Sequence, residues 1–340
     1  MHVEDLNQIV DQKLRDLINE RELPLYRIIE YQMGWNDSVE ELSVGNDEVL
    51  KGNELISNPF GVLCLLASSS NHTQIKDAIK PAVSIEMISK FLQIHDDIQS
   101  GNPSRNGRDT VWWLWGPAQA INAGDGLHAL ARLTILQMHE DGYPSENIFQ
   151  MLSILDQATL KACEGRYLDL EAQESIDMNI QNYLQMSGDR LGSVFSCALQ
   201  LGYIINSNNP EKLNVISSCG NALGIALQIA TDINIIWADG SDIELLNKKK
   251  ILPVVLGMSK ASISEKRKLG DIFFKRLLES SDVVSIREIL EDLDIKNQSF
   301  NLLEDYKSQC QKGLKEIFED SQKLEIASSY VNNIIDNGIK

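Results

Sequence analysis

The sequence predicts an all-α protein, and three observations support this fold class. Apolar residues recur at steps of three and four near the N-terminus and again over residues 223–236, as they do in amphipathic helices. Alternation of apolar and polar residues, the mark of a half-buried strand, is hard to find. No internal repeat of about 20 to 50 residues is evident, which disfavours a solenoid and favours a globular bundle of about ten or more helices.

The expected helices follow from this periodicity and from the residues that interrupt it. The first helix is marked by apolar side chains on one face, namely Leu6, Ile9, Val10, Leu14, Leu17 and Ile18. Further helices are expected over about 55–69, 80–99, 117–140, 145–163, 174–205, 223–236 and 250–260, with two or more after residue 264. Breaks or starts are supplied by Gly142, Pro144, Ser145 and Pro210.

The composition favours one domain over residues 1–340. The chain is 43% apolar and 24% charged, which is ordinary for a globular protein with a sizeable core. Eight prolines and 21 glycines are spread along it, without a low-complexity tract or a break in composition that would mark a linker. The length alone would also allow two domains.

Charge and cysteine usage narrow the possible partners and the compartment. Thirty-one basic and 49 acidic residues give a net charge of −18, which disfavours a nucleic-acid partner and adsorption to an anionic membrane. A protein this acidic needs a metal ion to bind a diphosphate. Five scattered cysteines without a metal-like spacing, and no apolar stretch that approaches the length of a membrane span, lead us to expect a cytoplasmic protein with reduced thiols.

An adjacent acidic pair, Asp96 and Asp97, marks the first candidate site. On a helix that ends near residue 100, Asp96 and Ser100 share a face while Asp97 points about 100° away. Two carboxylates that face a second acidic helix would hold hard divalent cations, which in turn bridge to a diphosphate. A solvated surface pair or a helix-end feature is the alternative interpretation.

The motifs around this pair resemble those of the trans-isoprenyl diphosphate synthase (polyprenyl synthetase) family. Asp96 and Asp97 match the first two aspartates of its DDxxD motif, Ser100 stands where the third belongs, and Arg105 matches the first arginine that follows. The resemblance is strongest over residues 50–260 and includes the segments CEGRYLDL, DRLGSVF, GNALGIALQIATDINIIWAD and NKKKILPVV. It implies an isoprenoid synthase-type helical bundle around a deep apolar pocket, with two acidic motifs across its mouth and Mg²⁺ or Mn²⁺ as cofactor.

Several departures from the family pattern fall on the residues that hold isopentenyl diphosphate. Leu55 and Asn58 replace a lysine and an arginine of the GGKxxRP segment, and Asn106 replaces the second arginine after DDxxD. A charge-assisted hydrogen bond contributes about 1.5 to 3 kcal/mol, so the loss of three removes orders of magnitude in affinity. We therefore predict that the isopentenyl diphosphate site is lost.

The residues that the resemblance assigns to the allylic diphosphate are better kept. Arg105 and Gln228 match, Arg190 replaces a lysine and keeps its charge, and Lys249 and Lys250 lie near a late lysine of the family. Phe91 occupies a position where the family sets pocket depth, which favours short allylic chains of ten or fifteen carbons within a range of ten to twenty. The alternative is that common surface cations and a core phenylalanine fall near these positions by chance.

The second acidic motif is degraded from DDxxD to TDINI, which leaves Asp232 with Thr231 and Ile235 at the outer positions. Asp239 lies two helical turns after Thr231 and would supply a carboxylate on the same face. This loosely resembles the second metal motif of class I terpene synthases. The expected metal ligands are therefore Asp96, Asp97, Ser100, Asp232 and Asp239. Burial of Ile235 in an ordinary core is the alternative to this rescue of the motif.

Together these features predict an enzyme that ionises an allylic prenyl diphosphate with Asp96, Asp97, Arg105 and Arg190 as catalytic residues. Without an isopentenyl diphosphate site, a terpene synthase (cyclase) or an atypical prenyltransferase is expected. A catalytically impaired partner subunit of a prenyl diphosphate synthase is an alternative, and ordinary chain elongation is a weaker one. The resemblance also implies a homodimer, or a heterodimer with a related subunit.

Overall fold

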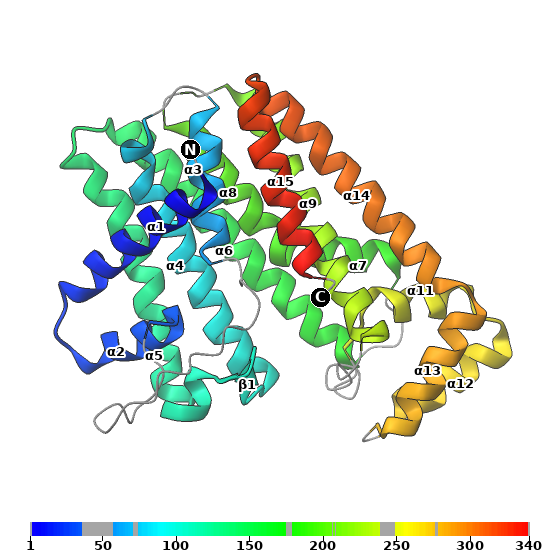
Figure 1. Ribbon diagram of the computed structural model, residues 1–340. Helices are drawn as coiled ribbons and strands as arrows, with labels where there is room; N and C mark the ends of the chain where they lie inside the picture. Colours follow the sequence, from blue (N-terminus) through cyan, green and yellow to red (C-terminus); the bar gives the residue numbers. More distant parts are fainter. Residues whose placement is uncertain are drawn as a thin grey trace. The chain divides into compact units, whose positions relative to one another are not determined.

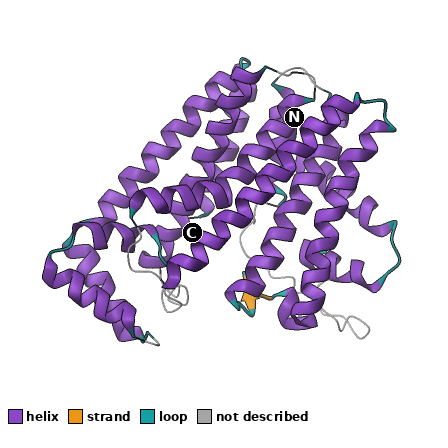
Figure 2. Cartoon of the chain, turned by 180° about the vertical axis from the view of Figure 1, so that it is seen from behind, coloured by secondary structure: helices purple, strands orange, loops and turns teal. Residues whose placement is uncertain are grey.

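The chain forms two compact helical units. The computed structural model describes residues 2–35, 57–70, 74–174, 179–205, 207, 209–238, 249–275 and 278–338. Unit 1 comprises residues 1–157 and 197–208, and unit 2 comprises 158–196 and 209–340. Within the described residues the chain is helical apart from one short hairpin (Figure 2), which confirms the all-α prediction. That the two units form a single domain stays a prediction.

Among its described residues, unit 1 contains five whole helices and one hairpin, together with the first part of α6 (Ser145–Glu174) and most of α8 (Ser193–Ile204) (Figure 1). The five whole helices are α1 (Val3–Asn19), α2 (Pro24–Met33), α3 (Pro59–Ser69), α4 (Ile75–Ser100) and α5 (Val111–Leu136). Strands β1 (Ser104–Arg105) and β2 (Arg108–Asp109) join α4 to α5, and the short 3₁₀ helix η1 (Gln137–His139) follows α5. The sequence prediction included all of the long helices here except α2, which begins at a proline in its first turn.

The periodicity of the sequence accounts for the burial of these helices. Leu6, Val10 and Leu14 of α1 are fully buried, as one apolar face of an amphipathic helix should be. Helix α3 is buried on every side, because its sequence is apolar all round, and it lies against α1 and α4. Helix α4 also lies against α5, so the acidic end of α4 is carried by a helix that is fixed on two sides.

Helix α5 contains a sharp break at its second turn. Gly116 has φ 78° and ψ 160°, a conformation that L-residues with a side chain rarely adopt, and Pro117 follows it. The glycine lets the chain change direction, and the proline starts the long second part of the helix. This explains why the periodicity of the sequence predicts a helix only from residue 117.

Unit 2 contains the second half of α6 (Ser145–Glu174), then α7 (Ile180–Ser187), the π-helical segment η2 (Gly188–Gly192) and the start of α8 (Ser193–Ile204). The rest of the unit consists of α9 (Pro210–Trp237), α11 (Leu252–Lys260), α12 (Ile263–Phe274), α13 (Ser280–Asp292), α14 (Ile295–Ile317) and α15 (Ser321–Asn337). The prediction of one helix over residues 174–205 is therefore wrong in detail. Helix α6 extends to Glu174, and a π-helical turn separates α7 from α8.

Helix α9 is the central element of unit 2 and lies against α14, α15 and η2. It is the one described helix that is long and apolar enough to cross a membrane by length and composition, and 61% of its most apolar window is buried in the protein. Near its end, Ile235 and Ile236 enter an apolar cluster with residues of α11, α12, α13 and α14. The core helix of a globular protein can be as long and as apolar as a membrane-spanning helix, and α9 is buried in this way.

Candidate active site

The first part of the site lies at the C-terminal end of α4 in unit 1. Gly101 ends the helix with a left-handed conformation, at φ 65°. Asp97 is buried, with 3% of its surface exposed, while the side chain of Asp96 is 18% exposed. Arg105 Nη2 lies 3.1 Å from Asp96 Oδ2 and 2.6 Å from Asp97 Oδ1, and Arg105 Nε donates to Asp97 Oδ1 at 2.8 Å. The structure thus joins three predicted site residues in one ionic cluster.

A two-residue hairpin turn places Arg105 against the aspartates. Ser104 pairs with Asp109 and Arg105 with Arg108, so Asn106 and Gly107 form the turn. Both have positive φ, 52° and 76°, as a type I′ turn requires, and Asn-Gly is the sequence that favours it. This hairpin was not predicted, although Asn106-Gly107 is a sequence signal for such a turn. The turn thus explains why asparagine stands at position 106, and this explanation does not depend on substrate binding.

The Asp96, Asp97 and Arg105 cluster carries one net negative charge. Burial alone lowers the pKa of Arg105, but the carboxylates of Asp97 and then Asp96 outweigh it, so the pKa of the guanidinium is raised. Arg105 therefore stays cationic. Carboxylate oxygens on one side and a guanidinium fork on the other suit a divalent cation and a diphosphate, respectively.

Other predicted residues of α4 lie near this cluster or in the core. Ser100 is the last residue of the helix and is partly exposed. Phe91 is 8% exposed, and its ring lies 4.6 Å from the ring of His95 and 5.3 Å from that of His128. These contacts place Phe91 in the core between α4 and α5. Its role in limiting substrate length stays a prediction.

In unit 2, a buried carboxylate organises two arginines. Asp169 of α6 is 1% exposed, and its Oδ2 accepts from Arg166 Nη1 at 2.5 Å and from Arg190 Nη1 at 3.1 Å. Arg190 lies in η2, and the close approach of η2 to α6 requires Gly165, where a Cβ would lie 2.6 Å from Arg190 N. Asp169 Oδ1 is buried without a hydrogen-bond partner among the described residues. Arg166 and Asp169 belong to the segment CEGRYLDL, from which no role of either residue was predicted.

Asp232 forms hydrogen bonds within the protein through both of its carboxylate oxygens. It is fully buried in α9, and its Oδ2 accepts from the Tyr183 hydroxyl at 2.6 Å and from Leu252 N at 2.8 Å. Its Oδ1 accepts from Gln228 Nε2 at 2.7 Å. Three protein donors thus satisfy this carboxylate, so a metal ion would have to displace some of them. The predicted diphosphate contact Gln228 is likewise engaged within the protein.

The other residues predicted around the second motif are only partly placed together. Lys249 is close enough to lower the pKa of Asp232, whereas Lys250 is 7% exposed with its Nζ 4.6 Å from the ring of Phe273. Ile235 is 5% exposed in the apolar cluster, as the alternative of ordinary core burial expects. Asp239 and Leu55 lie outside the described residues, so the rescue of the second motif stays untested.

The described residues fit a divalent cation at one place better than at the other. No group of three or more histidine, cysteine, aspartate or glutamate side chains is arranged to hold a metal ion within them. Asp96 and Asp97 offer hard oxygen ligands whose present partner, Arg105, is a cation that a diphosphate can take over. Asp232, with its oxygens already occupied by protein donors, does not fit a metal ion as it stands.

The titration of Asp232 leads to a prediction about stability. Burial raises the pKa of Asp232 to about 6, against the opposing effects of Lys249, Tyr183, Leu252 and Gln228. The carboxyl group of Asp232 therefore binds a proton more tightly in the folded protein than in the unfolded chain. Its contribution to the free energy of unfolding is full below about pH 4 and is lost as pH rises through about 6. The change from 3.8 to about 6 corresponds to on the order of 3 kcal/mol in the free energy of unfolding.

Asp232→Asn keeps the size of the side chain and removes its ionisation. We expect the variant to gain thermal stability relative to the wild type as pH rises from about 5 to about 7.5. Melting temperatures of both proteins in EDTA, at the two pH values, measure this. The same pH dependence in both proteins would show that Asp232 does not titrate in this range.

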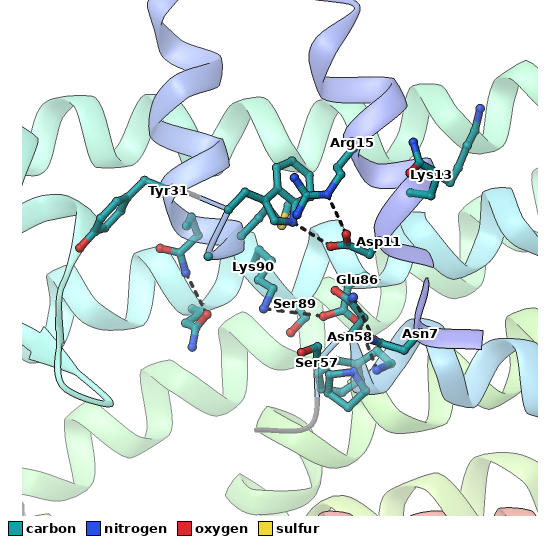
Figure 3. A pocket seen from close by; sticks show the side chains of 18 of the residues that line it. Asn7, Asp11, Lys13, Arg15, Tyr31, Ser57, Asn58, Glu86, Ser89 and Lys90 are labelled. Atoms are coloured by element: carbon teal, nitrogen blue, oxygen red, sulfur yellow. Dashed lines mark hydrogen bonds and ion pairs between the residues drawn. The ribbon is translucent and has the colours of Figure 1, made fainter. Parts of the chain in front are cut away.

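Unit 1 contains a large pocket next to the first aspartate motif. Its volume is about 1350 Å³, and Asp97, Arg105 and Asn106 form part of its wall. Figure 3 shows Asn58, Glu86, Ser89 and Lys90 gathered in another part of it, with residues of α1 above them. Most of the described lining side chains are polar, in contrast to the deep apolar pocket that the resemblance implies. Two of the substitutions predicted to remove isopentenyl diphosphate contacts, Asn58 and Asn106, thus line one cavity.

Comparison with known proteins identifies the family. The profile described as polyprenyl synthetase matches residues 59–293. The chain is 28% identical over 260 residues to a geranylgeranyl diphosphate synthase of Saccharolobus solfataricus. The aligned region covers 75% of this chain and 78% of the relative. It is 30% identical over 237 residues to a short chain isoprenyl diphosphate synthase of Methanothermobacter thermautotrophicus, with 67% of this chain and 70% of the relative covered.

Solved structures agree with this assignment. A geranylgeranyl pyrophosphate synthetase of Pyrococcus horikoshii has a TM-score of 0.81 at 26% identity and covers 98% of this chain and 97% of its own. A polyprenyl synthetase of Streptomyces coelicolor has a TM-score of 0.83 at 21% identity, over 97% of this chain and 98% of its own, and shows the shared fold. The profile match spans more than half of the chain, and from it we conclude that the chain belongs to the polyprenyl synthetase family.

Proposed function

We propose that the chain is a prenyltransferase that ionises an allylic prenyl diphosphate and joins the prenyl group to a second substrate. The observation that carries this proposal is the cluster of Asp96, Asp97 and Arg105 on the wall of the pocket in unit 1. The cluster lies where a diphosphate and a neighbouring substrate can be held together. The names of the relatives, which are prenyl diphosphate synthases, also support a transferase.

The chemistry requires that the leaving diphosphate be stabilised. The C1–O bond of the allylic substrate breaks, and both electrons leave with the diphosphate oxygen. The allylic cation then takes an electron pair from the second substrate, which gives up a proton. Arg105 is the guanidinium group of the cluster that is proposed to bind the leaving group. Arg190 of unit 2 is the second proposed catalytic cation, and buried Asp169 fixes its direction. Mg²⁺ or Mn²⁺ held by Asp96 and Asp97 would add Lewis-acid stabilisation of the same oxygens.

The polar pocket favours a transferase over a terpene cyclase. A cyclase folds one apolar substrate on itself and needs no second polar cavity beside its aspartates. In this chain, amide, hydroxyl and charged side chains line about 1350 Å³ adjacent to Asp97 and Arg105. The expectation of a cyclase, drawn from the loss of isopentenyl contacts alone, therefore ranks below a transferase with a second substrate.

Chain elongation with isopentenyl diphosphate is the second candidate. The relatives include enzymes named geranylgeranyl and farnesyl diphosphate synthase, and these names favour it. The neutral side chains at Asn58 and Asn106 oppose it, because neither can form a charge-assisted contact with a second diphosphate. Both candidates would use an allylic substrate of ten to twenty carbons. For either activity we propose that the protein is located in the cytoplasm.

A homodimer is also part of the proposal. Helix α5 leaves several large apolar side chains exposed, namely Leu114, Ile121, Leu133 and Leu136, with exposed fractions of 36%, 43%, 48% and 44%. Apolar side chains exposed together on one helix are typical of a surface that another chain covers. A heterodimer with a related subunit would use the same surface.

Product analysis with the purified chain tests the proposed function. Geranyl, farnesyl and geranylgeranyl diphosphates are each incubated with Mg²⁺, with and without isopentenyl diphosphate. We expect the chain alone to release diphosphate from at least one of them, with water in place of the second substrate as the group that captures the allylic cation. Longer prenyl diphosphates that form only when isopentenyl diphosphate is present would establish chain elongation instead. Turnover that appears only after addition of a related subunit would contradict the proposal.

A further inference from the structure

The pocket of unit 1 contains a buried carboxylate oxygen that has no hydrogen-bond partner in the part of the chain that the structure describes. Glu86 of α4 is fully buried, and its Oε2 accepts from Phe60 N at 3.1 Å and Gly61 N at 3.0 Å, at the start of α3. Its other oxygen, Oε1, is buried without a hydrogen-bond partner among the described residues, and Glu86 lines the pocket. A buried acceptor left unpaired costs about 1 to 3 kcal/mol, and more when charged. The first oxygen therefore has a structural role, while the second is available to a ligand.

Lys90, one helical turn further along α4, lies across a short gap from this oxygen. Its Nζ is 4.0 Å from Glu86 Oε1, which is too long for a direct hydrogen bond, and 21% of its side chain is exposed (Figure 3). With the two atoms 4.0 Å apart, one oxygen placed about 2.8 Å from each would form an angle of about 90° between them. A hydroxyl is the group that suits this position, because its oxygen accepts from the ammonium and its proton is donated to the carboxylate.

The charges of the pocket wall disfavour a second diphosphate. The described lining residues include six acidic side chains, Asp5, Asp11, Asp16, Glu86, Asp97 and Asp109, and five basic ones, Lys13, Arg15, Lys90, Arg105 and Arg108. Their sum is one net negative charge. A diphosphate is bound by a surplus of cations, whereas this wall has none.

Three of the five cations of the wall, all of them arginines, are also engaged by other side chains. Arg15 is paired with Asp11 at 2.7 Å, and Arg105 is paired with Asp96 and Asp97. Arg108 lies 4.4 Å from the ring centre of Tyr31. Neutral hydrogen-bonding groups complete the wall, including Asn58, whose Nδ2 donates to Asn7 Oδ1 at 3.1 Å. These side chains suit an uncharged polar molecule.

We propose that the second substrate is an uncharged molecule that bears a hydroxyl, and that Lys90 and Glu86 together bind this hydroxyl. This inference rests on the proposed function, since it names the chemical class of the second substrate. Glu86 and Asp97 are eleven residues apart on α4, or about 16 Å along the helix axis. The bound hydroxyl therefore positions the molecule, and the atom that receives the prenyl group lies nearer to Asp97.

Two probes with one carbon skeleton test the proposal. Binding of 3-methyl-3-buten-1-ol and of isopentenyl diphosphate to the full chain is measured by ligand-observed NMR, in EDTA so that metal-dependent binding is absent. We expect the alcohol to bind, and the diphosphate to bind no more tightly than the alcohol. Lys90→Met should weaken binding of the alcohol about tenfold, because a charge-assisted hydrogen bond is lost.

The chain offers a matched control on the same helix. Lys80 of α4 is 20% exposed in its side chain and is paired with Asp141 at 2.6 Å, outside this pocket. Lys80→Met should leave binding of the alcohol unchanged, and Lys90→Arg, which keeps the charge, should retain most of it. Equal melting temperatures confirm that the variants fold.

Three results would overturn the proposal. Tighter binding of isopentenyl diphosphate, lost in Lys90→Met, would make the pocket an anion site. Equal binding of the alcohol by the wild type and Lys90→Met would show adventitious binding, and no binding of either probe would leave the pocket without this role. Diphosphate release from allylic substrates is measured separately, so failure of the proposed function is distinguished from failure of this inference.

Discussion

Replacement of Asp96 by alanine is expected to lower the rate of diphosphate release from an allylic substrate by about a hundredfold or more. Asp96 is the more exposed member of the pair, and Arg105 keeps its two contacts with Asp97 when Asp96 is removed. The hairpin that carries Arg105 should therefore stay in place. The loss of rate would then come from the missing metal ligand and not from unfolding.

The partly exposed Asp156 provides a control for this substitution. It lies on α6, where it pairs with Arg132 at 3.1 Å, and it is not among the described residues of the pocket wall, so Asp156→Ala removes a carboxylate of unit 1 without touching the cluster or the pocket. Diphosphate release by this variant should remain near that of the wild type, and a coupled phosphate assay measures both. Normal activity of Asp96→Ala would refute the assignment of the first motif.

Replacement of Asp169 by asparagine is expected to have the largest effect on stability. The neutral amide leaves Arg166 and Arg190 without their shared carboxylate, and the side chains of these arginines are only 11% and 17% exposed. Removing one partner of a buried ion pair costs about 3 to 5 kcal/mol in the free energy of unfolding. Diphosphate release should fall as well, because Arg190 is no longer held in position.

Denaturant unfolding of Asp169→Asn measures the first effect, and an ion pair of the surface serves as the comparison. Asp156 and Arg132 lie 3.1 Å apart with side chains 42% and 45% exposed, so Asp156→Asn should cost less than about 1 kcal/mol. Adding Arg166→Met to Asp169→Asn should recover part of the loss, since one uncompensated charge is removed. Equal stability of the two aspartate variants would contradict the organising role of Asp169.

The first part of the site was predictable because it is local in sequence. Asp96 and Asp97 are neighbours at a helix end, and Arg105 lies only eight residues after Asp97, on the first strand of the hairpin that follows the helix. Helical periodicity likewise depends on near neighbours, so most of the long helices were expected. The hairpin itself was missed because its strands are two residues long and show no alternation.

The second part could not be predicted because its contacts join distant segments. Tyr183 and Leu252 lie 49 and 20 residues from Asp232, and only the folded chain shows that their donors satisfy this carboxylate. Arg190 reaches Asp169 across 21 residues. The sequence showed Asp232 as an acidic residue of a degraded motif, but its full burial is a tertiary property.

The lost family contacts illustrate a further limit of sequence comparison. Asn58 and Asn106 indicated that cationic contacts are missing, yet they did not show what replaces them. The structure places Asn58 beside Glu86 and Lys90 on one pocket wall. A carboxylate oxygen without a protein partner follows from the fold, because it depends on which groups reach Glu86.

The most direct test of the central claim is a single assay of the purified wild-type chain with farnesyl diphosphate and Mg²⁺. Diphosphate is quantified, and the fate of the farnesyl group is followed by mass spectrometry. Water takes the place of the second substrate in this assay: its oxygen bonds to C1 of the farnesyl cation and it gives up a proton. We therefore predict that the chain alone releases diphosphate, that the farnesyl group is recovered as an alcohol, and that both results require Asp96. Recovery of intact farnesyl diphosphate from a folded chain that binds it would contradict the claim that this protein ionises allylic diphosphates.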